Sequence, residues 1–369
     1  MRWILLLLAP LLAHAAAQPI FDGATLRGWV AEGPNPAFEV EKGQIAVTGA
    51  GNQPNWLHTA AEYENFRLHF EYRLAQWGEA AVVLRAPRLG RPMQAGLALY
   101  LAHDYHSNAA LHSTGAIPGV RAPAQALPPT FDVWHTVDLA LEGERLTASI
   151  DGTVVQDLQL SADTELRQRL KRGFIGFPDL GYKYWLRNIR VDDLGGGTKF
   201  AEPLGATLAG WELRGTGEWQ LHDGVLKAWS GDGVYYAPGE FRDFELTLLV
   251  NPHHRVNSGV FLRGSADLKA SRGFEVQIYS PLDSVYPTGS IYNVARSHIT
   301  AEYEERWFLM QITVEGTRCT VRLDGVTVAE TERLPEGLPA QGRIGLQFHS
   351  AGAWIEFRDL RIRPIGVRR

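Results

Sequence analysis

Short runs in which hydrophobic and polar residues alternate recur along the whole chain. These runs are rich in Val, Ile, Phe and Tyr, and a period of two is typical of β-strands with one buried face. Asp151-Gly152 and Asp324-Gly325 each follow such a run and indicate tight hairpin turns. We therefore predict antiparallel sheet, with strands within residues 66–74, 139–151, 244–250, 273–279, 308–314 and 320–323.

A helical period is weak by comparison. Residues 162–171 are the stretch in which we expect a surface helix, because Ser161 offers an N-cap. Many strands, few helices and frequent turns are typical of sandwiches made from two packed sheets. The predicted fold class is therefore all-β.

The chain carries the same set of motifs twice. GATLRGW at 23–29 returns as GATLAGW at 205–211, AAVVLRA at 80–86 as SGVFLRG at 258–264, and TGAIPGV at 114–120 as TGSIYNV at 288–294. The same order with similar spacing indicates two copies of one domain that differ by small loop insertions. We place the copies at residues 18–194 and 198–366, on either side of the glycine run at 195–197.

Composition excludes several classes of partner. The 369 residues are 45% hydrophobic and 21% charged, which suits two globular domains, each with its own core. The formal net charge is −5 and neither half carries a basic run, so we expect no binding to nucleic acid and none to a membrane. A neutral partner is expected instead, and the sequence leaves the oligomeric state open.

The first 17 residues have the organisation of a secretory signal peptide. Arg2 supplies the positive charge, residues 3–12 the apolar run and residues 13–17 a small-residue cleavage site, so the mature chain should start near Gln18. This organisation predicts an exported protein, periplasmic or extracellular. Cys319 is the only cysteine, so the stability of the fold cannot depend on an internal disulfide.

Two strands of the second copy carry polar residues with the chemistry of a carbohydrate site. Glu275 and Gln277 alternate with apolar neighbours, so both side chains point to one face of the predicted sheet. Gln347 and His349 repeat this arrangement on a later strand. If the two strands lie close together, one face gathers a carboxylate, an imidazole and two amides.

A third strand and two aromatic residues complete the candidate site. Asn257, Phe261 and Arg263 share one face of their strand by the same parity. Tyr292 and Trp307 offer rings on which a sugar can stack. The sequence therefore predicts a carbohydrate as the partner.

The first copy lacks the candidate acid and base. Alignment of the copies places Ala98 opposite Glu275 and Leu180 opposite His349, while the arginine persists as Arg85. Neither an alanine nor a leucine can exchange a proton. We therefore expect any chemistry in the second copy, and a structural or substrate-gripping role for the first.

Several motifs resemble those of the 3-keto-disaccharide hydrolase domain family. The resemblance covers nearly the whole mature chain as two tandem copies. It implies a concanavalin A-like jelly-roll β-sandwich in each copy, and a substrate glycoside whose C3 hydroxyl has been oxidised to a ketone. The motifs are FDGATLRGW at 21–29, FEVEKGQI at 38–45, NSGVFLR at 257–263, GFEVQI at 273–278, GSIY at 289–292, GRIGLQFH at 342–349 and IEFRDLRIR at 355–363.

A ketone at C3 determines the chemistry that such a substrate needs. It acidifies the C2 proton, so a base can remove that proton, the group at C1 leaves by elimination, and water then adds back. The site needs a base, an acid for the leaving oxygen, and a donor or cation for the enolate. Glu275 or His349 would be the base and the other the acid, with Arg263 or a bound divalent cation at the enolate.

The sequence leaves two alternatives open. It requires no cofactor, and the loop with His103, Asp104, His106 and His112 lacks a clean spacing of metal ligands, although a divalent cation would suit the enolate. The alternative to an enzyme is a non-catalytic carbohydrate-binding protein, for which aromatic residues and amides suffice. The carboxylate and imidazole together favour the enzyme.

Overall fold

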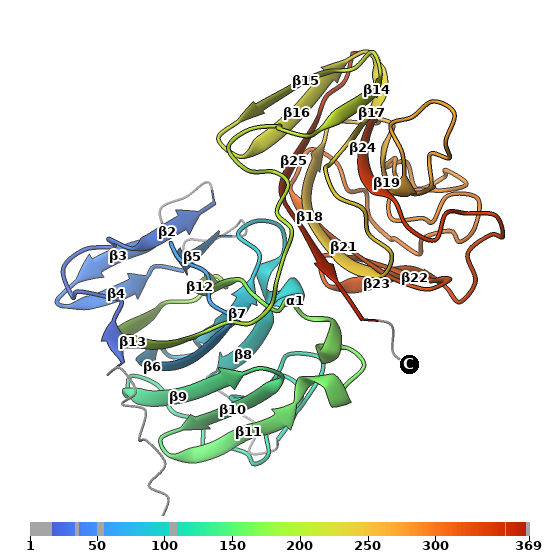
Figure 1. The fold of residues 1–369 in the computed structure, drawn as a ribbon. Coiled ribbons are helices and arrows are strands. Elements are labelled where there is room, and N and C mark those ends of the chain that lie inside the picture. The colour runs from blue at the N-terminus through green and yellow to red at the C-terminus, as the bar shows by residue number, and fades with distance from the viewer. Residues whose placement is uncertain (1–16, 34–36, 50–54, 103–108, 351, 367–369) are drawn as a thin grey trace, which may run out of the picture.

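Each half of the chain folds into two antiparallel sheets that pack face to face. The computed structural model describes residues 17–33, 37–49, 55–102, 109–350 and 352–366, so the expected signal peptide lies almost entirely outside the described residues. Figure 1 shows the two sandwiches side by side, coloured blue to green and yellow to red. The all-β class with two tandem jelly-roll sandwiches is thereby confirmed. No described helix is long and apolar enough to cross a membrane.

The first sandwich pairs an eight-stranded sheet with a five-stranded one. The larger sheet runs β11 (Thr153–Gln159), β10 (Arg145–Ile150), β9 (His135–Glu142), β6 (Asn65–Leu74), β13 (Tyr184–Gly195), β4 (Gln44–Val47) and β3 (Phe38–Glu41), with β1 (Gln18–Pro19) paired to β13. The smaller sheet runs β2 (Trp29–Glu32), β5 (Asn55–Thr59), β12 (Phe174–Asp179), β7 (Glu79–Ala86) and β8 (Leu97–Ala102). Their facing side chains form one core, in which Phe66, Phe70 and Tyr184 are fully buried.

The second sandwich pairs a five-stranded sheet with a seven-stranded one. The smaller sheet runs β14 (Glu212–Gly215), β17 (Asp232–Tyr236), β24 (Arg343–His349), β19 (Ser258–Gly264) and β20 (Phe274–Ile278). The larger sheet runs β15 (Glu218–His222), β16 (Val225–Ser230), β25 (Ile355–Pro364), β18 (Phe244–Pro252), β21 (Phe308–Glu315), β22 (Arg318–Leu323) and β23 (Val326–Thr331). A separate core fills this sandwich, with Phe308, Phe348 and Phe357 fully buried.

The hairpin turns follow the sequence signals. Asp151 and Gly152 adopt φ values of 50° and 76° between β10 and β11, and Asp324 and Gly325 adopt 46° and 81° between β22 and β23. These left-handed values are those that a two-residue hairpin turn requires. The run at 139–151 is divided, however, because a turn at Gly143 with φ 58° separates β9 from β10.

The prediction of a helix over residues 162–171 is wrong. The segment instead makes two short 3-10 turns, η1 (Leu160–Ala162) and η2 (Leu166–Gln168). Asp163 and Arg169 have extended backbones, with ψ values of 133° and 155°, and so interrupt a continuous helix. The side chain of Asp163 accepts the backbone N–H groups of Glu165 and Leu166 and caps the start of η2. The α-helix of the described chain, α1 (Pro92–Ala95), is a single turn.

The first sandwich docks on the outer face of the seven-stranded sheet of the second (Figure 1). Gly325 approaches α1 so closely that a Cβ atom at this position would lie 2.2 Å from the Gln94 carbonyl oxygen. Glycine is thus required here by contact as well as by its positive φ. A small apolar cluster seals the junction and consists of Ala95, Leu249 and Leu309, with Leu89, Leu170 and Trp307 packed around them.

Ion pairs also connect the two sandwiches at this junction. Arg361 of β25 lies 2.8 Å from both carboxylate oxygens of Glu62, which also lies 3.3 Å from Arg172. These three side chains are largely buried, so their charges attract in a medium that screens them less than water does. The pairing therefore contributes to holding the two sandwiches in one orientation.

We predict that Glu62→Gln destabilises the protein by about 1–3 kcal/mol, because it leaves the partly buried guanidinium groups of Arg172 and Arg361 with only the more exposed carboxylate of Glu202. Urea unfolding of the whole chain measures this free energy. The matched control is Asp157→Asn, which breaks an exposed pair with Arg145 and should leave the unfolding free energy nearly unchanged, because solvent screens that pair. Equal effects of the two variants would contradict the structural role of Glu62.

Candidate functional site

The three strands that carry the candidate residues are neighbours. β24, β19 and β20 lie next to one another in the five-stranded sheet, as the sequence argument required. In register, Glu275 faces Phe261, which in turn faces Gly345, and Gln277 faces Gly259. These positions belong to the face that turns away from the core of the sandwich, because their neighbours Val260, Val276 and Leu346 fill that core.

Glu275 is a partly buried carboxyl group with a shifted pKa. It folds over Gly259 of the next strand, where a Cβ atom would lie 2.1 Å from Glu275 Oε1. Burial raises the pKa of Glu275 to about 7, against the opposing influence of the nearby Arg272 and His349. A carboxyl group with a pKa near neutrality is suited to accept and return a proton at physiological pH.

His349 is oriented by a carboxylate that the sequence argument missed. Its Nδ1 lies 3.0 Å from Asp232 Oδ1, and the two residues face each other in the register of β24 and β17. A carboxylate on Nδ1 fixes the orientation of the ring. Asp232 could have been found from the sequence, because it alternates with Val234 and Tyr236, whose side chains share the same outer face.

The amide groups of the site bind one another and leave one acceptor unused. Gln277 Nε2 donates to Asn257 Oδ1 at 3.1 Å, and the backbone N–H of His349 donates to the Asn257 carbonyl at 3.0 Å. Gln347 Oε1 is buried and has no hydrogen-bond partner among the described residues. A buried acceptor of this kind favours the binding of a donor, such as a sugar hydroxyl or a water.

Tyr292 lies beside Glu275 at the edge of this face. Its backbone N–H donates to the Glu275 carbonyl oxygen at 2.9 Å, and its side chain is 43% exposed. The ring of Tyr286 lies 5.2 Å from the Tyr292 ring. The pair gives the site an accessible aromatic rim, which suits contact with the apolar side of a sugar.

Arg263 does not belong to this face, so the expectation from strand parity is wrong there. A β-bulge between Phe261 and Gly264 shifts the register, and Arg263 adopts a φ of 55°. Its buried guanidinium donates to the Arg242 carbonyl at 2.8 Å and to Asp243 Oδ1 at 3.2 Å. A bulge redirects the side chains that follow it, which alternation along a regular strand cannot anticipate.

The first copy shows that this arginine serves the fold. Arg85 also adopts a positive φ, of 45°, and donates to the carbonyl oxygens of Glu64 and Gly143. Both copies therefore use a bulged, buried arginine to tie a strand of the smaller sheet to neighbouring loops. The role does not depend on Glu275 or His349, which have no counterpart in the first copy.

Trp307 is also absent from the site. It packs against Ala95, Leu249 and Leu309 at the junction between the sandwiches, on the other side of the second sandwich from Glu275. The junction could not be located from the sequence, because it joins residues far apart in the chain. The expectation that Trp307 stacks on a sugar at this site is therefore wrong.

The equivalent face of the first sandwich is filled with apolar side chains. Trp56 and Phe174 are buried there, and the ring of His58 lies between them at 4.6 Å from each. Ala98 packs in the same cluster, at the position of Glu275. The first sandwich also docks away from the Glu275 face, which supports a structural role over a substrate-gripping one.

Arg272 places a positive charge at the site, and no sequence motif indicated it. Its charge lowers the pKa of Glu275, and its side chain is exposed. The loop that ends at Arg272 is held against β14 by Arg214, whose guanidinium donates to the carbonyl oxygens of Ser265, Asp267, Leu268 and Ala270. The described part of the chain brings together no group of three or more His, Cys, Asp and Glu side chains that could hold a metal ion, and His103, Asp104 and His106 lie outside it.

Comparisons with solved structures find proteins of similar fold. A protein of Parabacteroides distasonis ATCC 8503 that carries the provisional name glycosyl hydrolase is 16% identical, with a TM-score of 0.43, and the match covers 48% of this chain and 94% of that one. The carbohydrate binding module CBM66 of Bacillus subtilis is 14% identical, with a TM-score of 0.34, and the match covers 45% of this chain and 96% of that one. The comparison with curated proteins finds no match.

The family comparison covers most of the chain and agrees with the internal repeat. Residues 16–192 and 201–363 each match the family described as "3-keto-alpha-glucoside-1,2-lyase-like domain". The resemblance inferred from the motifs is thereby confirmed for both copies. The chain therefore belongs to the 3-keto-alpha-glucoside-1,2-lyase-like domain family, of which it carries two tandem copies.

Proposed function

We propose that the second sandwich cleaves 3-keto-glycosides by removing the C2 proton, eliminating the group at C1 and adding water. The observation that carries this proposal is the pair of proton-transfer groups on one sheet face, Glu275 with a pKa raised to about 7 and His349 paired with Asp232. Family membership gives the chain a carbohydrate-related function, and the reaction is our inference from the site.

Glu275 serves as the base in this reaction. Its carboxylate takes the C2 proton, and the electron pair left on C2 forms an enolate with the C3 ketone. Because burial raises the pKa of Glu275 to about 7, its carboxylate is a stronger base than an exposed carboxylate and is still available at neutral pH.

His349 serves as the acid for the leaving group. When the enolate returns to the ketone, a double bond forms between C1 and C2 and the bond from C1 to the leaving oxygen breaks. Protonated His349 donates its proton to that oxygen, and Asp232 holds the ring in place. Water then adds to C1 while C2 regains a proton, so the sum of the steps is hydrolysis.

Arg272 is the positive charge that we assign to the enolate, in place of Arg263. Arg272 is exposed and near Glu275, whereas Arg263 is buried in hydrogen bonds of the fold. A fixed cation close to the C3 oxygen stabilises the negative charge that develops there. A bound divalent cation would supply the same stabilisation.

The second candidate function is sugar binding without chemistry. The unpaired acceptor of Gln347 and the exposed ring of Tyr292 favour it, since amides and aromatic rings suffice to hold a sugar. The hydrolase would release the aglycone and exchange the C2 proton with solvent, whereas a sugar-binding protein would do neither.

We predict that the protein releases the aglycone from a 3-keto-glycoside in heavy water and that the product carries deuterium at C2. The unoxidised parent glycoside should be a poor substrate, because its C2 proton is not acidic. Mass spectrometry and NMR of the products measure both outcomes. Release from the parent at a similar rate without deuterium would rule out the elimination, and binding of both sugars without turnover would favour the binding function.

We predict that Glu275→Gln reduces kcat/KM by at least about 100-fold, the scale of a lost general base. In the wild type, kcat/KM should fall as the pH drops below about 7, because protonation removes the base. Glu218→Gln, on exposed β15 of the same sandwich, is the matched control and should keep the wild-type rate and profile.

The difference in unfolding free energy between the wild type and Glu275→Gln should change with pH in a defined direction. The pKa of Glu275 is raised from 4.5 in the unfolded chain to about 7 in the fold, so the folded state favours the protonated form. The wild type should therefore lose stability relative to Glu275→Gln as the pH rises from 4.5 to about 7. A constant difference in unfolding free energy across this range would contradict the buried position of the carboxyl group.

We predict that Gly259→Ala abolishes most activity although Glu275 remains. The new Cβ atom would occupy the place of Glu275 Oε1 and push the carboxylate out of its position. The control is Ala81→Gly, the reverse change at the equivalent strand position of the first copy, which should leave kcat/KM unchanged. Wild-type activity in Gly259→Ala would show that the position of the Glu275 carboxylate over residue 259 is not needed.

A further inference from the structure

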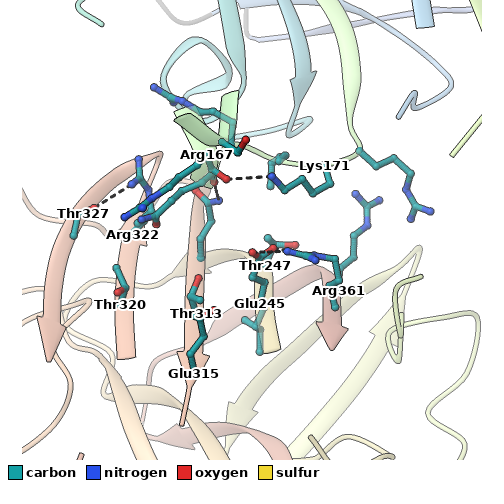
Figure 2. Close-up of a pocket in the computed structure, with 18 of the residues that line it drawn as sticks. Arg167, Lys171, Glu245, Thr247, Thr313, Glu315, Thr320, Arg322, Thr327 and Arg361 are labelled. Carbon is teal, nitrogen blue, oxygen red and sulfur yellow. Dashed lines mark hydrogen bonds and ion pairs between the residues drawn. The ribbon is translucent and has the colours of Figure 1, made fainter. Parts of the chain in front are cut away.

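A cavity lies between the two sandwiches, remote from Glu275. Its volume is about 470 Å³, within the range of small-molecule sites. Figure 2 shows Arg167 and Lys171 entering it from the first sandwich, and Thr247, Thr313 and Arg322 from strands of the second. The cavity therefore exists only where the two copies meet.

Basic residues outnumber acidic ones in the lining of this cavity. Eight lysine and arginine residues line it against four glutamates. Most of the cations have carboxylate partners, either in the lining, as in the pairs Lys171–Glu144 and Arg363–Glu245, or beside it, as in the pairs Arg172–Glu202, Arg318–Glu332, Arg322–Glu165 and Arg361–Glu62. Arg169 forms no ion pair with any carboxylate in the described part of the chain.

Buried donors in the wall have no acceptor. Arg169 Nε and Nη1 are buried without a hydrogen-bond partner among the described residues. Nε of Arg322 is also unpartnered, but its other two nitrogens donate to Thr327, Gly325 and the Glu165 carboxylate. Burial, and after it the positive charge of Arg322, lowers the pKa of Arg169 to about 10. The two guanidinium groups therefore repel each other. Glu165 already offsets the charge of Arg322, so the unsatisfied group is Arg169, whose unpartnered donors an anion in the cavity would satisfy.

We propose that this cavity binds a small ligand carrying an oxyanion group, which the guanidinium group of Arg169 recognises. The hydroxyl groups of Thr247, Thr313 and Thr320 line the rest of the wall and suit neutral oxygen atoms of the same ligand. An acidic sugar offers both kinds of group, and a free oxyanion offers the first. The site is independent of the proton-transfer groups at Glu275 and His349.

Calorimetric titration of the full chain with D-glucuronate, sodium sulfate and D-glucose tests the proposal. Glucuronate, sulfate or both should bind the wild type, and Arg169→Gln should weaken that binding by at least about tenfold. Any glucose binding should be insensitive to this change. The control is Arg333→Gln, which removes an exposed arginine paired with Glu336 and should leave anion binding unchanged.

The melting temperature of the unliganded variant separates a binding role from a structural one. Arg169 is buried without a carboxylate partner, so Arg169→Gln should melt no lower than the wild type while it loses the stabilisation by ligand. If Arg169→Gln fails to fold, Thr313→Val removes one hydroxyl of the lining without a change of charge and should weaken glucuronate several-fold.

The outcomes distinguish the two sources of the anion. Sulfate binding without glucuronate binding supports a free oxyanion, and tighter binding of glucuronate supports an acidic sugar. The proposal is overturned if neither anion binds at millimolar concentration, or if Arg169→Gln and Thr313→Val bind as the wild type does. Glu275→Gln should bind the anions normally, so this result does not depend on the proposed hydrolysis.

Discussion

The close contact between the turn at Asp324-Gly325 and the segment around α1 determines how the molecule is arranged. Cβ atoms at Gly90 and Gly325 would lie 2.8 Å from Asp324 Oδ1 and 2.2 Å from the Gln94 carbonyl oxygen, so larger residues would force the sandwiches apart. This contact fixes the first sandwich on the outer face of the seven-stranded sheet. It leaves the Glu275 face open to solvent and encloses the cavity between the copies (Figure 2).

The two copies show how one backbone gives two different surfaces. In the second copy, Gly259 makes room for a carboxyl group, and the surrounding burial raises the pKa of Glu275. In the first copy, Trp56 and Phe174 fill the corresponding face around the ring of His58, and Ala98 takes the place of the carboxyl group. Each copy has a five-stranded sheet with an outer face at the corresponding position, so the chemistry depends on a few side chains on that face.

Sequence patterns correctly predicted the features that depend only on neighbouring residues, namely strand faces and hairpin turns. Alternation along regular strands placed Glu275, Gln277 and Gln347 on one sheet face, and the Asp-Gly pairs marked real hairpins. Arg263 was misplaced because a bulge breaks the alternation, and Trp307 because a contact between distant segments buries it. The raised pKa of Glu275 could not be predicted from the sequence either, because it results from burial of the side chain over Gly259 of the next strand.

The cations of the junction cavity lie at positions where the two copies no longer agree. Alignment on the Asp-Gly turns places Ser149 opposite Arg322, and alignment of Gly173 with Gly342 places Leu338 opposite Arg169. One sandwich alone has no partner surface to enclose such a space. The junction cavity is thus a compartment that only the tandem arrangement creates, and its lining draws on positions at which the two copies differ.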